Sequence, residues 1–111
     1  MSPPRYQAAN QRFTAFFNRL TKARLSGSPL APAIADAVGS ELAAINPATD
    51  LPPEAAKLWN GFVDDYISFA GGAGADPLAK LRTLAEPQAE AAMELIGDVQ
   101  QILAETLRKG R

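Results

Sequence analysis

The sequence predicts an all-α fold, a small bundle of four main helices with a fifth, short helix before the last of them. Apolar residues recur three and four residues apart over long segments, which is the period of a helix with one buried face. Alanine makes up about a fifth of the chain and β-branched residues are few, a mix that favours helices. The 111 residues, 47% of them hydrophobic, are the size of one globular domain, so we expect a single helical-bundle domain over residues 1–111.

The first predicted helix spans residues 5–25. Its apolar residues share one arc: Tyr6, Ala9, Phe13, Phe16, Phe17 and Leu20. Arg5, Arg12 and Arg19 recur every seven residues and border that arc. Gly27 follows the helix at a position where a left-handed backbone conformation is common.

The second predicted helix spans residues 29–46. A capping hydroxyl followed by proline, Ser28 and Pro29, is typical of a helix start. Its apolar stripe consists of Leu30, Ile34, Val38, Leu42 and Ile45. We expect the helix to end at Asn46, because the residue before a proline disfavours the helical conformation. Residues 46–53, with three prolines, then form a stiff connector.

The third predicted helix spans residues 53–70. Its aromatic residues form a row at helical spacing: Trp59, Phe62, Tyr66 and Phe69. Val63, Ile67 and Ala70 widen the apolar arc to about half the circumference, which indicates two neighbouring elements. We therefore predict that these three residues form an interface with a second copy of the chain, in a symmetric homodimer.

The last two helices are predicted at residues 77–85 and 87–109, with a break or sharp kink near Pro87. The glycine-rich stretch before the short helix, residues 71–76, lacks the lysine and hydroxyl residue of a phosphate-binding loop and is interpreted as a connection. The long helix separates its faces clearly. Its apolar side holds Ala92, Leu95, Ile96, Val99, Ile102, Leu103 and Leu107, and its acidic side holds Glu90, Glu94, Asp98 and Glu105.

The composition argues against several kinds of chemistry. The chain has neither histidine nor cysteine, so it lacks the usual transition-metal ligands, the commonest general base and any thiolate. Its acidic row faces away from the apolar face, as a solvated surface does. We therefore predict no enzyme activity, no metal and no cofactor. No apolar run is long enough to span a membrane, and we expect a cytoplasmic, bacterial-type protein.

The charge is distributed unevenly along the chain. Residues 1–35 carry five basic and no acidic residues, whereas the remainder carries six basic and twelve acidic ones. Such asymmetry is typical of a surface that meets an acidic partner or a second copy. The candidate partner or surface contacts lie on the first helix: Arg5, Arg12, Phe16, Phe17, Arg19 and Lys22. The same pattern also fits a helix whose phenylalanines pack in the core and, alternatively, one that lies on an anionic lipid or polymer-granule surface. With a pI near 5.3 and no groove-reading motif, nucleic acid is not expected as a partner.

Glu41 interrupts the apolar stripe of the second helix. A buried carboxylate without a partner is costly, so it should pair with a cation or reach solvent. If the first two helices form a hairpin that turns near Gly27, Glu41 lies level with Arg12. We predict a buried Glu41–Arg12 salt bridge; the alternative is a carboxylate that extends from the rim of the stripe into water.

These observations favour a non-enzymatic helical interaction module, such as a small adaptor, assembly factor or chaperone-like subunit, acting as a homo-oligomer. The first alternative is an amphipathic protein that contacts lipid or granule surfaces through its first helix. The second is an enzyme with carboxylate or tyrosine chemistry, which would require a deep pocket that brings Glu41 or Asp65 to Tyr6 or Tyr66.

Overall fold

The computed structural model describes residues 4–67 and 78–109. All regular secondary structure in these two ranges is helical. The elements are α1 (Pro4–Leu25), α2 (Leu30–Ala37), the π-helix η1 (Val38–Leu42), α3 (Pro47–Asp50), α4 (Pro53–Tyr66), α5 (Ala79–Arg82) and α6 (Glu86–Lys109). This confirms the predicted all-α bundle with its four main helical segments and a short helix before the last.

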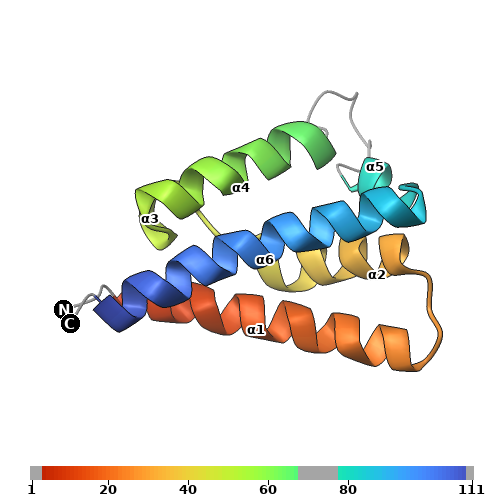
Figure 1. The fold of residues 1–111 in the computed structure, drawn as a ribbon, viewed down its shortest axis with the longest axis horizontal. Coiled ribbons are helices and arrows are strands. Elements are labelled where there is room, and N and C mark those ends of the chain that lie inside the picture. Colours follow the sequence, from red (N-terminus) through yellow and green to blue (C-terminus); the bar gives the residue numbers. More distant parts are fainter. Residues whose placement is uncertain (1–3, 68–77, 110–111) are drawn as a thin grey trace.

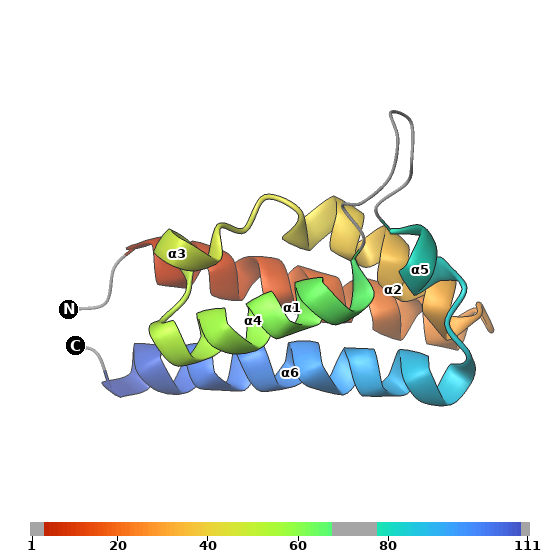
Figure 2. The ribbon, with the colours of Figure 1, turned by 90° about the horizontal axis from the view of Figure 1, so that it is seen from above.

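The four main segments alternate in direction along the bundle (Figure 1). Helix α1 and the long α6 run antiparallel, so that the start of α1 and the end of α6 lie at the same end of the molecule. The α2–η1 segment returns along α1, and α4 packs mainly on α6. Seen from above, α4 runs alongside α6, and α5 lies beside α2 (Figure 2). The core thus forms where the apolar faces of α1, α2, α4 and α6 converge.

Aromatic side chains fill the centre of this core. Phe13 and Phe62 are fully buried, and Trp59 is only 4% exposed. The Trp59 ring meets Phe13 edge-on, with ring centroids 5.9 Å apart, and stacks on Phe62 at 5.1 Å. The apolar face predicted for α6 supplies the opposite wall through Ala92, Ile96, Val99 and Leu103, all fully buried. The spacing of apolar residues in the sequence therefore predicted the buried faces of α4 and α6 correctly.

The turn between α1 and α2 depends on glycine. Gly27 has a φ of 77°, the left-handed conformation that follows many helices. Its amide donates to the Arg24 carbonyl, and the Ser28 amide donates to the Ala23 carbonyl. The predicted Ser28 cap is wrong, however, because the N-cap position of α2 is occupied by Pro29 and no side-chain hydrogen bond caps the helix.

The second helical segment is less regular than predicted. Helix α2 ends at Ala37, and the chain continues as the π-helix η1 before a turn at Ala43 and Ala44. The predicted stiff connector contains one helical turn, α3. Asn46 caps the start of α3, and its side chain accepts a hydrogen bond from the Ala48 amide at 3.0 Å.

The third helix is shorter than predicted. It ends at Tyr66, because Ile67 has an extended backbone, with φ −115° and ψ 125°. Phe69, Ala70 and the glycine-rich stretch lie outside the described residues. The predicted break near Pro87 is confirmed, since α5 ends at Arg82 and α6 begins at Glu86, which places Pro87 in the first turn of α6.

Two glycines give a direct stability test of this geometry. Gly27→Ala should lower the free energy of unfolding by about 1–2 kcal/mol, because a side chain strains the left-handed backbone. Gly61→Ala should raise it by up to ~1 kcal/mol, because a Cβ at this position in α4 meets no atom within 4 Å and alanine favours helix. Urea unfolding of both variants, followed by circular dichroism, measures the two changes in the free energy of unfolding. If both substitutions raised or both lowered this free energy, the described geometry of the turn would be contradicted.

Candidate functional site

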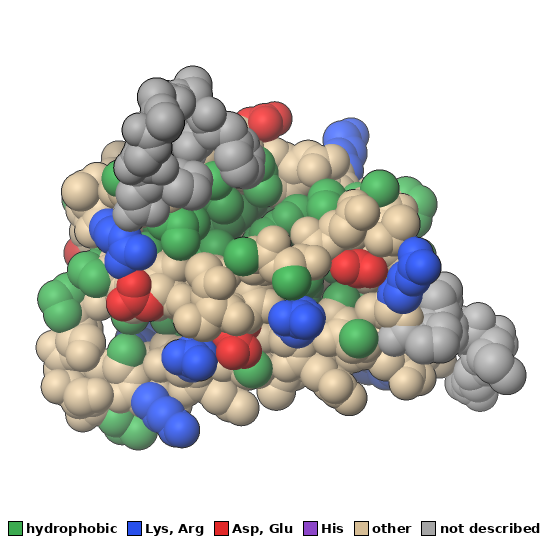
Figure 3. Space-filling model, turned by 180° about the vertical axis from the view of Figure 1, so that it is seen from behind, with side chains coloured by type: hydrophobic (Ala, Val, Ile, Leu, Met, Phe, Trp, Pro, Cys, Tyr) green, Lys and Arg blue, Asp and Glu red, His purple; other side chains and the backbone are tan. Residues whose placement is uncertain are grey.

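An apolar pocket opens between η1 and α4. Its volume is about 340 Å³, and its lining combines the η1 side, the α4 side and the residue before α5: Val38, Leu42, Ala43, Ile45, Pro47, Trp59, Asn60, Val63, Ile67 and Leu78. We call it the apolar pocket. Figure 3 shows hydrophobic side chains gathered in a hollow on this face of the molecule. None of the described residues that line it is ionisable.

The α4 side of the pocket is formed by residues four apart in the sequence, which lie on one face of the helix. Trp59 and Val63 are one turn apart on α4, and Ile67 follows one turn later at the helix end. Trp59 is held by its stack on Phe62, whereas Val63 and Ile67 are only partly buried, so part of their apolar surface remains accessible to a ligand or partner.

The π-helix forms the opposite side. Val38 and Leu42, its first and last residues, are both buried and both line the pocket. Leu78 approaches this helix so closely that a Cβ added to Gly39 would lie 3.1 Å from the Leu78 Cδ1 atom. Glycine at position 39 therefore lets Leu78 pack against η1 at the edge of the pocket. Short π-helical turns of this kind are frequent at functional sites.

The lining of the apolar pocket is aliphatic and aromatic, with a single side-chain amide. A cleft of this volume with mostly apolar and aromatic walls is typical of small-molecule sites in proteins. Asn60 contributes an exposed amide, which can both donate and accept hydrogen bonds. No lining residue supplies a general base, and the described lining contains no hydroxyl or amine nucleophile.

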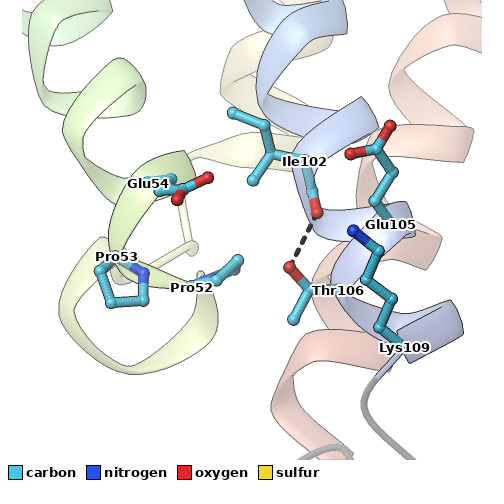
Figure 4. Close-up of a pocket in the computed structure, with 7 residues that line it drawn as sticks. All are labelled: Pro52, Pro53, Glu54, Ile102, Glu105, Thr106 and Lys109. Carbon is cyan, nitrogen blue, oxygen red and sulfur yellow. Dashed lines mark hydrogen bonds between the residues drawn. The ribbon is translucent and has the colours of Figure 1, made fainter.

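A second, more polar pocket lies between the start of α4 and the end of α6. It has a volume of about 380 Å³ and is lined by Pro52, Pro53, Glu54, Ile102, Glu105, Thr106 and Lys109. Figure 4 shows Glu54 on the α4 side, and Glu105 and Lys109 on the α6 side. The Thr106 hydroxyl donates to the Ile102 carbonyl of its own helix at 2.9 Å, as threonines within helices commonly do. This arrangement brings no activated nucleophile into the pocket.

The residues of α1 that were predicted to contact a partner are partly buried in the core and partly exposed. Phe16 is fully buried in the core, and Phe17 is partly buried, with its ring edge-on to Phe16 at a centroid distance of 4.9 Å. The predicted contact role of Phe16 is therefore wrong, because the apolar arc of α1 faces the bundle. The cations remain exposed on the surface: Arg5, Arg12, Arg19 and Lys22.

Glu41 makes its ion pair with a different arginine from the one predicted. The Nε atom of Arg19 lies 3.3 Å from the Glu41 carboxylate, whereas Arg12 donates through Nη1 to the Glu41 backbone carbonyl at 3.4 Å. Arg12 is thus level with Glu41, as predicted. The carboxylate reaches Arg19 because helical side chains lean toward the start of their helix, which brings Glu41 and Arg19 toward each other in an antiparallel hairpin. The pair is not buried, since the Arg19 and Glu41 side chains are 56% and 20% exposed.

Two of the three predicted interface residues lie at the apolar pocket. Val63 and Ile67 line it, whereas Ala70 lies outside the described residues. Val38, Leu42 and Leu78 also line the pocket, although no site was predicted at these positions. The only signal at these positions was their apolar character, which a core residue shares.

Residues 4–67 and 78–109 form neither a cluster of metal ligands nor a membrane span. Within these ranges, no group of three or more acidic residues is placed to hold a metal ion, and no helix is long and apolar enough to cross a membrane. Comparisons with protein-family models, with curated proteins and with solved structures found no match to this chain. Of the two pockets described above, only the apolar pocket has an aromatic wall and a lining without an ionisable side chain.

Proposed function

We propose that the protein is a non-enzymatic helical interaction module that associates with a second copy of itself through the apolar pocket and the neighbouring face of α4. It would act in the cytoplasm as a small bacterial-type adaptor, assembly factor or chaperone-like subunit. The observation that carries this proposal is the uncharged, apolar lining of the pocket, with Val63 and Ile67 partly accessible at its α4 side.

A second copy is the occupant that best matches this chemistry. In a two-fold dimer the same patch meets itself, so the charges of both partners must be compatible with self-contact. The described lining meets this condition because it has no ionisable side chain to desolvate or repel its counterpart. Depletion of charged residues is also what distinguishes the core of a protein–protein interface from the rest of the surface.

The alternative function, binding of α1 to a lipid surface, would require an exposed apolar face on α1. An interfacial helix inserts its apolar face into the headgroup region. On α1, that face is turned into the bundle, with Phe13 and Phe16 fully buried. Of the large hydrophobic residues described on α1, only Leu25 at its C-terminal end is exposed, so the arginines do not border a continuous exposed apolar face, and we do not favour this function.

Light scattering coupled to size-exclusion chromatography tests the proposal. Over a range of protein concentrations, the mass should approach twice the chain mass of 11.8 kDa. Ala43→Asp should weaken association by about tenfold or more, because it places an unpaired carboxylate at the pocket. Ile67→Asp should weaken it further, although Ile67 also packs against the core, so circular dichroism must show that this variant is folded.

The matched control is Ala44→Asp. Ala43 and Ala44 are adjacent, exposed and in the same turn, but only Ala43 is among the lining residues. Ala44→Asp should leave the dissociation constant within about twofold, since exposed substitutions away from a site have small effects. A wild-type mass that stays at 11.8 kDa at every concentration, or equal effects of the two aspartates, would reject self-association through this pocket.

A further inference from the structure

The apolar pocket is also large enough to hold a small molecule in place of a second copy of the chain. Its volume of about 340 Å³ lies at the lower end of the range of small-molecule sites, roughly 300–1,000 Å³. It has an aromatic wall in Trp59 and one polar side chain, the Asn60 amide, among otherwise apolar side chains. A planar apolar group against Trp59, with one hydrogen-bonding group that can reach Asn60, would satisfy both kinds of surface.

Charge defines the ligand class more sharply. A charged ligand entering this pocket would exchange water for a lining that offers no ionisable partner among the described residues. Such desolvation without compensation is unfavourable. An uncharged aromatic or aliphatic molecule avoids this cost and gains from removal of its apolar surface from water.

We propose that the apolar pocket binds a neutral, predominantly apolar small molecule, and that this ligand competes with the second copy of the chain. The first part depends only on the pocket. The second part rests on the proposed function, because competition requires self-association through the same residues. Ligand binding would then regulate assembly, since each ligated chain lacks a free surface for its partner.

Trp59 makes ligand binding directly measurable. It is the only tryptophan in the chain and it lines the pocket, so its emission reports on the site. The test uses two dyes that share an anilinonaphthalene framework: neutral N-phenyl-1-naphthylamine and the anionic 8-anilinonaphthalene-1-sulfonate. The neutral dye should quench Trp59 saturably with one dye per chain. The sulfonate should bind at least about tenfold more weakly, because its charge finds no partner.

A matched pair of variants locates the binding site. Ala43→Phe adds a large side chain at the pocket and should weaken binding of the neutral dye by about tenfold or more, whereas Ala44→Phe should change it less than about twofold. Ala43 is exposed, so the larger side chain does not have to enter the core. Absence of saturable quenching, equal affinity for the two dyes, or equal binding by the two variants would overturn the ligand proposal.

Light scattering with and without the neutral dye tests the competition separately. At a protein concentration that gives the dimer, saturating dye should return the mass toward 11.8 kDa. A bound dye that leaves a dimeric mass unchanged would overturn competition but not binding. A wild-type chain that is monomeric throughout would reject the proposed self-association and the competition with it, while the fluorescence titration still decides whether the pocket binds its ligand.

Discussion

Phe16→Ala should lower the free energy of unfolding by about 3–5 kcal/mol. Phe16 is fully buried on α1, and truncation removes both its apolar contacts and its edge-on packing with Phe17. Phe16 and Ile96 of α6 belong to the same cluster of buried residues, and because such cores are closely packed, truncation leaves a cavity that relaxes only partly. Urea unfolding at fixed protein concentration, followed by circular dichroism, measures the change.

Phe17→Ala provides the comparison within the same helix. Phe17 is only partly buried, and its ring lies 3.7 Å from the Cβ position of Gly97, so it packs at the border between α1 and α6. Less apolar surface returns to water when it is truncated, and we expect about half the loss or less. If α1 instead served as a lipid-binding helix with outward phenylalanines, Phe16→Ala would leave stability almost unchanged. Equal losses in the two variants would also contradict the described orientation of α1.

Strong local patterns made α1 and α6 predictable. Each is long, has one apolar arc, and is bounded by a local signal, Gly27 after α1 and Pro87 at the start of α6. Helical period alone therefore separated the buried residues from the exposed ones in α6. The same period could not decide whether the phenylalanines of α1 meet the core or a surface, because both alternatives require one apolar arc.

The segment from Leu30 to Leu42 shows where local patterns are insufficient. Apolar residues such as Val38 and Leu42 have the same spacing whether the backbone bonds are those of an α-helix or of the wider π-helix. Likewise, counting outward from Gly27 placed Arg12 level with Glu41, but the carboxylate meets Arg19 because side chains lean along their helices.

The apolar pocket combines predictable and unpredictable residues. Val63 and Ile67 were recognisable because the apolar arc of their helix is wider than one neighbour requires. The η1 side and Leu78 could not be assigned to the same site, because only the three-dimensional packing brings them opposite α4. Sequence period indicates which residues avoid water, but it does not indicate which buried residues leave space between them.

Phe62→Ala should also lower the free energy of unfolding by about 3–5 kcal/mol, and it should change the apolar pocket as well. Phe62 is fully buried, with Trp59 stacked on it at 5.1 Å and Tyr66 at a centroid distance of 5.3 Å. Truncation creates a cavity behind the Trp59 ring. We therefore expect a shifted Trp59 emission maximum in the folded variant, together with a lower urea midpoint.

Lys57→Ala is the matched control on the same helix. Lys57 is exposed on α4, and its loss should change the free energy of unfolding by less than about 0.5 kcal/mol, with no shift in Trp59 emission. If Phe62→Ala lowered stability but left both the emission and the affinity for the neutral dye unchanged, Trp59 would not depend on Phe62 for its position. If stability, emission and dye affinity change together, the core stack that holds α4 in the bundle also holds the aromatic wall of the binding site.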